Sequence, residues 1–259
     1  MRYFLHMAYL GTEYRGWQRQ DNTNGKCVQQ VVEDALHKMT KTQISFMGCG
    51  RTDAGVHAKQ YFGHFDYANE WSFDPVERLN RILPKDISVY EIIPFDNWVH
   101  SRYDAIQRSY EYHIHFEKNP YLSPISAHYQ TTGLDLNLLK IGVAHIQTLT
   151  DFRHLCLTPD KFVNTFCFMY NSQMIVSQDG KQLCFQFTAN RFLRSMIRII
   201  VSRLIALGEG VITLDEFKDA NRNNQSFLFR TMFFPEGLHL TRVVYPYLER
   251  EPKANVLLN

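Results

Sequence analysis

The order of strand and helix patterns in the first 95 residues most restricts the fold of this chain. Apolar side chains at helical spacing alternate there with short runs typical of strands. Asp74, Pro75 and Glu77 form a capping-box pattern that opens the second helix. The order is β-α-β-β-α-β, the split ferredoxin-like unit. The expected elements are residues 2–9, 27–39, a short strand before residue 49, then 60–66, 75–83 and 87–93.

A loop flanked by glycines falls between the second and third of these strands. It has the sequence GRTDAGVHA at residues 50–58. Gly50 and Gly55 allow the backbone to turn sharply and another molecule to come close to it. Asp53 stands in the middle of this loop. Two interpretations stay open from these residues alone: Asp53 is a functional acid, or it only caps a turn through its own backbone.

The second half of the chain repeats this order with insertions. Asp179-Gly180 predicts a hairpin turn, and Thr213 with Glu216 forms a capping box. We therefore predict an α/β (α+β) fold of two ferredoxin-like β-α-β-β-α-β halves that share a mixed, mainly antiparallel sheet. The halves are residues 1–105, which carry the glycine-flanked loop, and residues 106–259. Expected elements here are residues 109–116, 134–146, 174–176, 183–187, 191–207, a short helix from 213, and 240–245.

Two tyrosines alternate with Glu111 along the first strand of the second half. Tyr110 and Tyr112 are two residues apart, so their side chains are expected on the same face of the sheet. In RNA-recognition modules with this element order, aromatic side chains on an open sheet face stack on bases. The other interpretation is that both rings belong to the core, which is commoner for a single pair of tyrosines.

The expected helix over residues 191–207 carries a row of arginines. Arg191, Arg194 and Arg198 are three and four residues apart, which predicts that they lie on one helix face. Arg191 and Arg194 are either solvated or in contact with phosphate. Apolar neighbours surround Arg198, and a half-buried arginine needs an anionic partner. Asp53 is one candidate for that partner, although spacing alone does not select it.

Composition excludes several classes of protein. The five cysteines are odd in number and lack C-x-x-C spacing, which favours reduced thiols over disulfides or a zinc site. The eleven histidines include no H-E-x-x-H pattern, so we expect no metal. No apolar run is long enough to span a membrane and the first residues do not form a signal peptide, so a cytoplasmic protein is expected. The net charge is only +2, but residues 180–208 hold five basic and no acidic residues, which predicts a local basic patch.

Motifs along the whole chain resemble those of the tRNA pseudouridine synthase A family. Residues 50–58 resemble the family's catalytic loop. Residues 11–20, GTEYRGWQRQ, resemble its N-terminal G-x-x-Y-x-G-W-x-x-Q segment. Further resemblances follow in the same order at residues 28–29, 100–105 (HSRYDA), 108–112 (RSYEY), 151–152 (DF), 190–198 and 235–245.

The resemblance implies the pseudouridine synthase fold and roles for individual residues. Asp53 would be the catalytic aspartate, Tyr110 the ring stacked on the target uracil, and Arg198 the cation paired with Asp53. Arg51 would help to extrude or hold the flipped nucleotide. The other candidates for contact with RNA are Arg15, Arg19, Arg191 and Arg194.

The resemblance also implies a homodimer that converts uridine to pseudouridine in the anticodon stem-loop of tRNA, without metal or organic cofactor. The reaction breaks the N1–C1′ bond, turns the uracil and rejoins it through C5. One carboxylate is needed, to attack or to assist proton removal. The base must leave its stack at a cost of about a few kcal/mol, which stacking on an aromatic ring partly offsets.

Two places depart from the family's pattern. Residues 165–168, TFCF, contain no arginine where the family usually has a threonine followed closely by one, and Arg194-Ser195 replace its common pair of histidines or similar residues. These differences bear on the target uridine. The alternatives are a diverged synthase acting on another uridine or RNA, and an RNA-binding protein or chaperone without activity. A metabolic enzyme ranks last, because no phosphate loop or cofactor motif is present.

Overall fold

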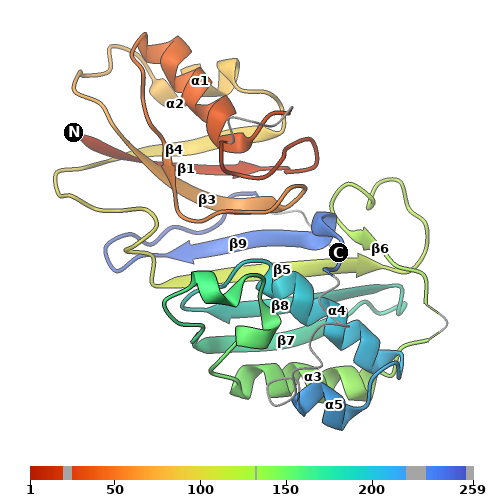
Figure 1. Ribbon diagram of the computed structural model, residues 1–259. Helices are drawn as coiled ribbons and strands as arrows, with labels where there is room; N and C mark the ends of the chain where they lie inside the picture. The colour runs from red at the N-terminus through yellow and green to blue at the C-terminus, as the bar shows by residue number, and fades with distance from the viewer. Residues whose placement is uncertain (20–24, 132, 220–231, 255–259) are drawn as a thin grey trace. The chain divides into compact units, whose positions relative to one another are not determined.

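The computed structural model describes residues 1–19, 25–131, 133–219 and 232–254 of the chain. These residues form two compact units (Figure 1). Unit 1 consists of the described residues of 1–106 together with 239–254, and unit 2 consists of the described residues of 107–238. The sequence-based division at residue 105 into two ferredoxin-like halves stays a prediction.

Unit 1 contains the expected β-α-β-β-α-β order, which is confirmed. Its strands lie in the order β4-β1-β3-β9, and β2 pairs with β3. The β1–β3, β1–β4 and β2–β3 pairs are antiparallel, whereas β3 and β9 run parallel although they come from opposite ends of the chain. The elements are β1 (Arg2–Tyr9), α1 (Val28–Thr40), β2 (Met47–Gly48), β3 (His57–Asp66), α2 (Pro75–Ile82), β4 (Ile87–Phe95) and β9 (Leu238–Val244).

Local sequence explains most of these boundaries. Seven of the eight residues of β1 are buried, so both faces of this strand are covered. The Asp74 side chain accepts hydrogen bonds from the backbone N–H groups of Val76 (2.9 Å) and Glu77 (3.2 Å), so the predicted cap of α2 is confirmed. The Glu77 carboxylate pairs with Arg81 one turn further on. The helices α1 and α2 pack against each other, and α2 packs on β4 (Figure 1).

Unit 2 has the strand order β5-β8-β7, all antiparallel, with the short β6 parallel to β5. The α3 helix packs on β7 and on α4 (Figure 1). Gly180 takes φ 71° in the predicted hairpin turn between β7 and β8. The Thr213–Glu216 capping box is confirmed. The elements are β5 (Gln107–His115), β6 (Ala127–His128), α3 (Leu136–Thr148), β7 (Met169–Val176), β8 (Gln182–Ala189), α4 (Met196–Gly208) and α5 (Leu214–Lys218), with 3-10 turns at Arg153–Leu155, Pro159–Lys161 and Pro235–Gly237.

The sheet of unit 2 has two chemically different faces. Tyr112, Phe185 and Phe187 are fully buried on the face that α3 covers, where the Ser172 hydroxyl donates to the Val143 carbonyl of α3 (3.0 Å). Half-buried polar side chains occupy the alternate positions of β5 and β8. The α+β class with a mixed, mainly antiparallel sheet is therefore confirmed.

None of the helices in the described ranges is long and apolar enough to cross a membrane.

Candidate active site

The loop that carries Asp53 connects β2 to β3 in unit 1. Asp53 is half-buried, and its carbonyl accepts a hydrogen bond from the backbone N–H of Val56 (3.2 Å). Gly55 takes φ 79°, so the glycine in this turn is required by its backbone conformation. A side-chain carbon at Gly50 would meet no atom within 4 Å and its φ is ordinary, so only one of the two flanking glycines supplies left-handed backbone.

The N-terminal segment of residues 11–17 holds this loop through backbone contacts. The N–H of Trp17 donates to the Thr52 carbonyl (3.1 Å), and the N–H of Gly55 donates to the Tyr14 carbonyl (3.2 Å). Gly16 has φ 92°, and a Cβ there would lie 2.6 Å from the Thr52 oxygen. The positions on either side of Asp53 are therefore fixed by a segment about forty residues earlier in the sequence.

Aromatic side chains also contact and support the same loop. The Tyr9 and Thr52 hydroxyls are hydrogen-bonded (2.9 Å), and the Tyr61 hydroxyl donates to the Gly50 carbonyl. Trp17 and Tyr61 stack with ring centroids 4.0 Å apart. Sequence reasoning did not assign a role to Tyr9 or Tyr61, because the contacts that give them one are not local in sequence.

Gly11 and Tyr14 of the N-terminal segment make further contacts that anchor it. A Cβ on Gly11 would lie 2.0 Å from the Val56 carbonyl oxygen, and the Gly11 N–H donates to His57 Nδ1 (2.9 Å). The Tyr14 hydroxyl donates to Asp86 (2.8 Å), and burial raises the pKa of this phenol well above its ordinary value. The resemblance in this segment thus corresponds to a packing requirement around the Asp53 loop.

Three of the predicted arginines belong to unit 1. Arg51 is exposed, two residues before Asp53. Arg15 is exposed, and its side chain lies against Gly25. Arg19 is exposed and forms an ion pair with the buried carboxylate of Glu33 on α1, at 3.7 Å between Nη1 and Oε2.

Unit 2 holds Tyr110 and Arg198. Tyr110 lies on β5, half-buried, with its ring edge-to-face against Phe192 at a centroid distance of 5.0 Å. Tyr112 is fully buried and its hydroxyl donates to the Phe234 carbonyl, so for this tyrosine the core interpretation is correct. Arg198 is 9% exposed on α4, and its Nε donates to the Phe233 carbonyl (2.7 Å).

The prediction that Arg191, Arg194 and Arg198 share one helix face is wrong. The α4 helix begins only at Met196, because Ser195 takes a left-handed conformation with φ 56° and ends any continuous helix before it. Arg191 instead donates through Nη2 to the Asn164 carbonyl (2.7 Å), and Arg194 is exposed. Packing decides this break, since Leu193 is buried and Phe192 lies against the Tyr110 ring.

The segment at residues 151–152 also has a local structural role. The Asp151 carboxylate accepts from the Thr165 hydroxyl and from the backbone N–H of Arg153 (3.1 Å). Phe152 is fully buried. Thr165 thus keeps a contact with Asp151 in the segment where the expected arginine is missing.

Comparison with known proteins identifies the class to which this loop and its supports belong. The protein family described as tRNA pseudouridine synthase matches residues 6–104 and 149–246. The chain belongs to this family. It is an isomerase of the tRNA pseudouridine synthase type.

Particular relatives match over nearly the full chain. A protein named tRNA pseudouridine synthase A from Parabacteroides distasonis is 35% identical over 95% of this chain and 96% of its own. Proteins of the same name from Porphyromonas gingivalis and Exiguobacterium sibiricum are 34% and 32% identical, each over 95% of this chain and 97% of their own.

Proposed function

We propose that this chain isomerises uridine to pseudouridine in the anticodon stem-loop of tRNA, with Asp53 as the catalytic carboxylate. Tyr110 stacks on the target uracil, Arg198 is the cation paired with Asp53, and Arg51 holds the flipped nucleotide. The enzyme works as a homodimer in the cytoplasm. The family match over residues 6–104 and 149–246, which includes the Asp53 loop, is the observation that carries the proposal.

The backbone around Asp53 supports this role. A carboxylate that attacks a sugar or ring carbon must be held in one position, because misplacement by about 1 Å costs on the order of a hundredfold in rate. Thr52 is bonded through both its carbonyl and its hydroxyl, and Gly55 is bonded through its N–H. Thr52 and Gly55, on either side of Asp53, are thereby each fixed by hydrogen bonds of their own.

The role of Tyr110 rests on different support. It lies outside the two matched ranges, so its assignment depends on the RSYEY motif at residues 108–112. Its half-buried ring is held edge-on by Phe192. A fixed, partly exposed aromatic ring on a strand is suited to stacking on an extruded base.

Contacts with the rest of the tRNA are assigned to exposed or half-buried arginines. We propose Arg191 and Arg194 in unit 2, and Arg15 and Arg19 in unit 1. Arg191 is oriented by its bond to the Asn164 carbonyl, so its guanidinium is positioned before RNA binds. A positioned guanidinium suits phosphate recognition because it presents a planar set of donors.

Release of tritium from tRNA labelled at uracil C5 tests the proposal, because rejoining through C5 expels that label. Wild type is expected to release tritium, and Asp53→Asn to lower the rate about a thousandfold or more. Asp34→Asn, an exposed acid on α1, is the control and should leave the rate unchanged. Asp53→Ala should bind tRNA with nearly the wild-type affinity.

Two results would contradict the proposal. The first is tritium release by Asp53→Asn at the wild-type rate. The second is tight tRNA binding by wild type without release from transfer, ribosomal or total RNA, which identifies an RNA-binding protein without this activity.

A further inference from the structure

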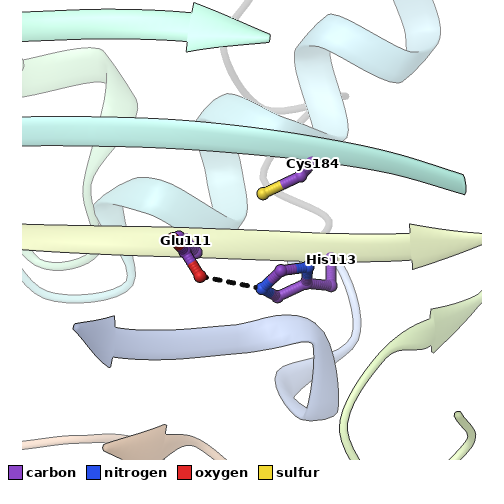
Figure 2. A group of neighbouring side chains, drawn as sticks. All are labelled: Glu111, His113 and Cys184. Atoms are coloured by element: carbon purple, nitrogen blue, oxygen red, sulfur yellow. Dashed lines mark hydrogen bonds and ion pairs between the residues drawn. The ribbon is translucent and has the colours of Figure 1, made fainter. Parts of the chain in front are cut away.

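Three side chains with different donor atoms meet on the polar face of the unit 2 sheet (Figure 2). Glu111 and His113 come from β5, and Cys184 comes from the neighbouring β8. One carboxylate oxygen, one imidazole nitrogen and the sulfur atom all lie within 4.8 Å of one another. Together they offer an oxygen, a nitrogen and a sulfur ligand at one place.

The strand pairing fixes this meeting point. Glu111 and His113 are two residues apart on β5, so both side chains leave the same face. His113 is paired directly with Cys184 in the antiparallel register, and Glu111 with Gln186. Directly paired residues have Cβ atoms about 5 Å apart. Because β8 is paired on both sides, by β5 and by β7, Cys184 is held in the interior of the sheet.

Neighbouring groups orient the carboxylate. Glu111 Oε1 accepts a hydrogen bond from Gln186 Nε2 (3.2 Å), and the Gln186 amide oxygen is bonded in turn by Gln173. The other carboxylate oxygen, Oε2, lies 3.0 Å from His113 Nε2 (Figure 2). Metal-binding carboxylates are commonly held by such outer hydrogen bonds, which set the direction of the ligating oxygen.

We propose that Glu111, His113 and Cys184 bind a Zn²⁺ ion, with water as the fourth ligand. Zinc accepts carboxylate, imidazole and thiolate in tetrahedral sites, and its bonds of about 2.0–2.3 Å place donor atoms about 3.5 Å apart. The observed limits of 3.0 Å for one pair and 4.8 Å for all three include this spacing. Magnesium and calcium are excluded as the preferred ion, because they select oxygen ligands.

The ion would act on the stability of unit 2 and not on the uracil. Tyr110 alternates with Glu111 along β5, so its side chain leaves the opposite face of the sheet. A zinc ion at the three residues links β5 to β8 and stabilises the fold by binding the native state only. Binding releases the thiol proton, so the affinity should increase with pH. Zinc binding at these three residues therefore does not depend on the catalytic role proposed for Asp53.

Titration of the full-length, chelator-treated protein with Co²⁺ tests the site, since cobalt replaces zinc and is coloured. Wild type is expected to show a thiolate-to-cobalt charge-transfer band and the visible bands of a tetrahedral ion. Both should saturate at one ion per chain and be lost on adding Zn²⁺. Cys184→Ser should remove the charge-transfer band, and His113→Gln should weaken binding at least about tenfold.

The control is Cys27→Ser. Cys27 is the N-cap of α1 and makes no side-chain capping bond, and serine is a preferred residue at that position, so this variant should fold and bind as wild type. Zinc should raise the urea midpoint of wild type and of Cys27→Ser, but not of Cys184→Ser. If Cys184→Ser does not fold, His113→Gln decides the question. Absence of the charge-transfer band in wild type, or an unchanged band in Cys184→Ser, would overturn the proposal.

Discussion

Glycine at positions 11 and 16 permits two backbone segments to lie closer together than any side chain allows. A Cβ at either position would penetrate the carbonyl of Val56 or of Thr52. The turn containing Asp53 is therefore shaped by main-chain contacts that require glycine at positions 11 and 16. At this scale the requirement on residue type follows from contact distance and, at Gly16, also from a φ of 92°.

Gly16→Ala should therefore destabilise unit 1 and lower activity. The left-handed conformation costs an ordinary residue about 1–2 kcal/mol, and the 2.6 Å contact with the Thr52 oxygen adds to this. Urea unfolding should show a loss of at least about 1–2 kcal/mol, and tritium release should decrease as the Asp53 loop moves. Gly50→Ala is the matched control for stability, because its Cβ meets nothing within 4 Å. Equal losses of stability in the two variants would refute the explanation.

At the scale of elements, those with local signals were predictable and those set by distant contacts were not. The Asp74 and Thr213 caps follow from side chains two or three residues from the groups they bind, and both were predicted. The start of α4 was not, because the left-handed Ser195 depends on how Leu193 and Phe192 pack. The parallel pairing of β9 with β3 was likewise not predictable from local sequence, because most of the chain separates the two strands.

Protonation of His6 on β1 should make the stability of unit 1 sensitive to acid. His6 is fully buried between Phe62, whose ring centroid is 4.7 Å away, and Tyr90. Burial lowers the pKa of His6 to about 4, with Glu91 opposing and Lys253 and Arg250 assisting the shift. The unfolded chain therefore takes up this proton first, so stability present above about pH 6.5 is lost as the pH falls towards 4.

His6→Phe should lessen that loss. The difference between the ordinary pKa of 6.5 and about 4 corresponds to at most about 3–4 kcal/mol of folding free energy. In urea unfolding between pH 7 and pH 4, the variant should lose less stability than wild type by up to that amount. His37→Gln, an exposed histidine on α1, should keep the wild-type dependence. A wild-type pH dependence in His6→Phe would show that another group, such as the buried His64, carries the effect.

At the scale of the whole molecule, the residues with proposed roles divide between the two units. Asp53, Arg51, Arg15 and Arg19 belong to unit 1, and the other four candidates belong to unit 2. The resemblance assigned roles to Asp53, Tyr110 and Arg198 because each stands in a short sequence motif, whereas Arg191 and Arg194 were chosen from the spacing of arginines. It could not name Tyr9, Tyr61 or the Phe233 carbonyl, whose contacts with Thr52, Gly50 and Arg198 join segments distant in sequence.

The overall charge of +2 makes the placement of basic residues more important for RNA binding than their number. Arg191→Ala combined with Arg194→Ala should weaken tRNA binding and flatten its dependence on salt. Each lost phosphate contact lowers the slope of log K against log salt by about 0.7–0.9, so the slope should decrease by about one to two. Filter binding or anisotropy across a salt series measures it.

Lys140→Ala with Lys181→Ala removes the same two charges from exposed positions elsewhere in unit 2, and is the matched control. If Arg191 and Arg194 contact phosphates, the control pair should change the slope much less than the arginine pair does. Equal changes would mean that only net charge matters, because long-range attraction does not depend on which two cations are lost. An unchanged slope in the arginine variant would remove both residues from the RNA interface and leave Arg15 and Arg19 as the remaining candidates.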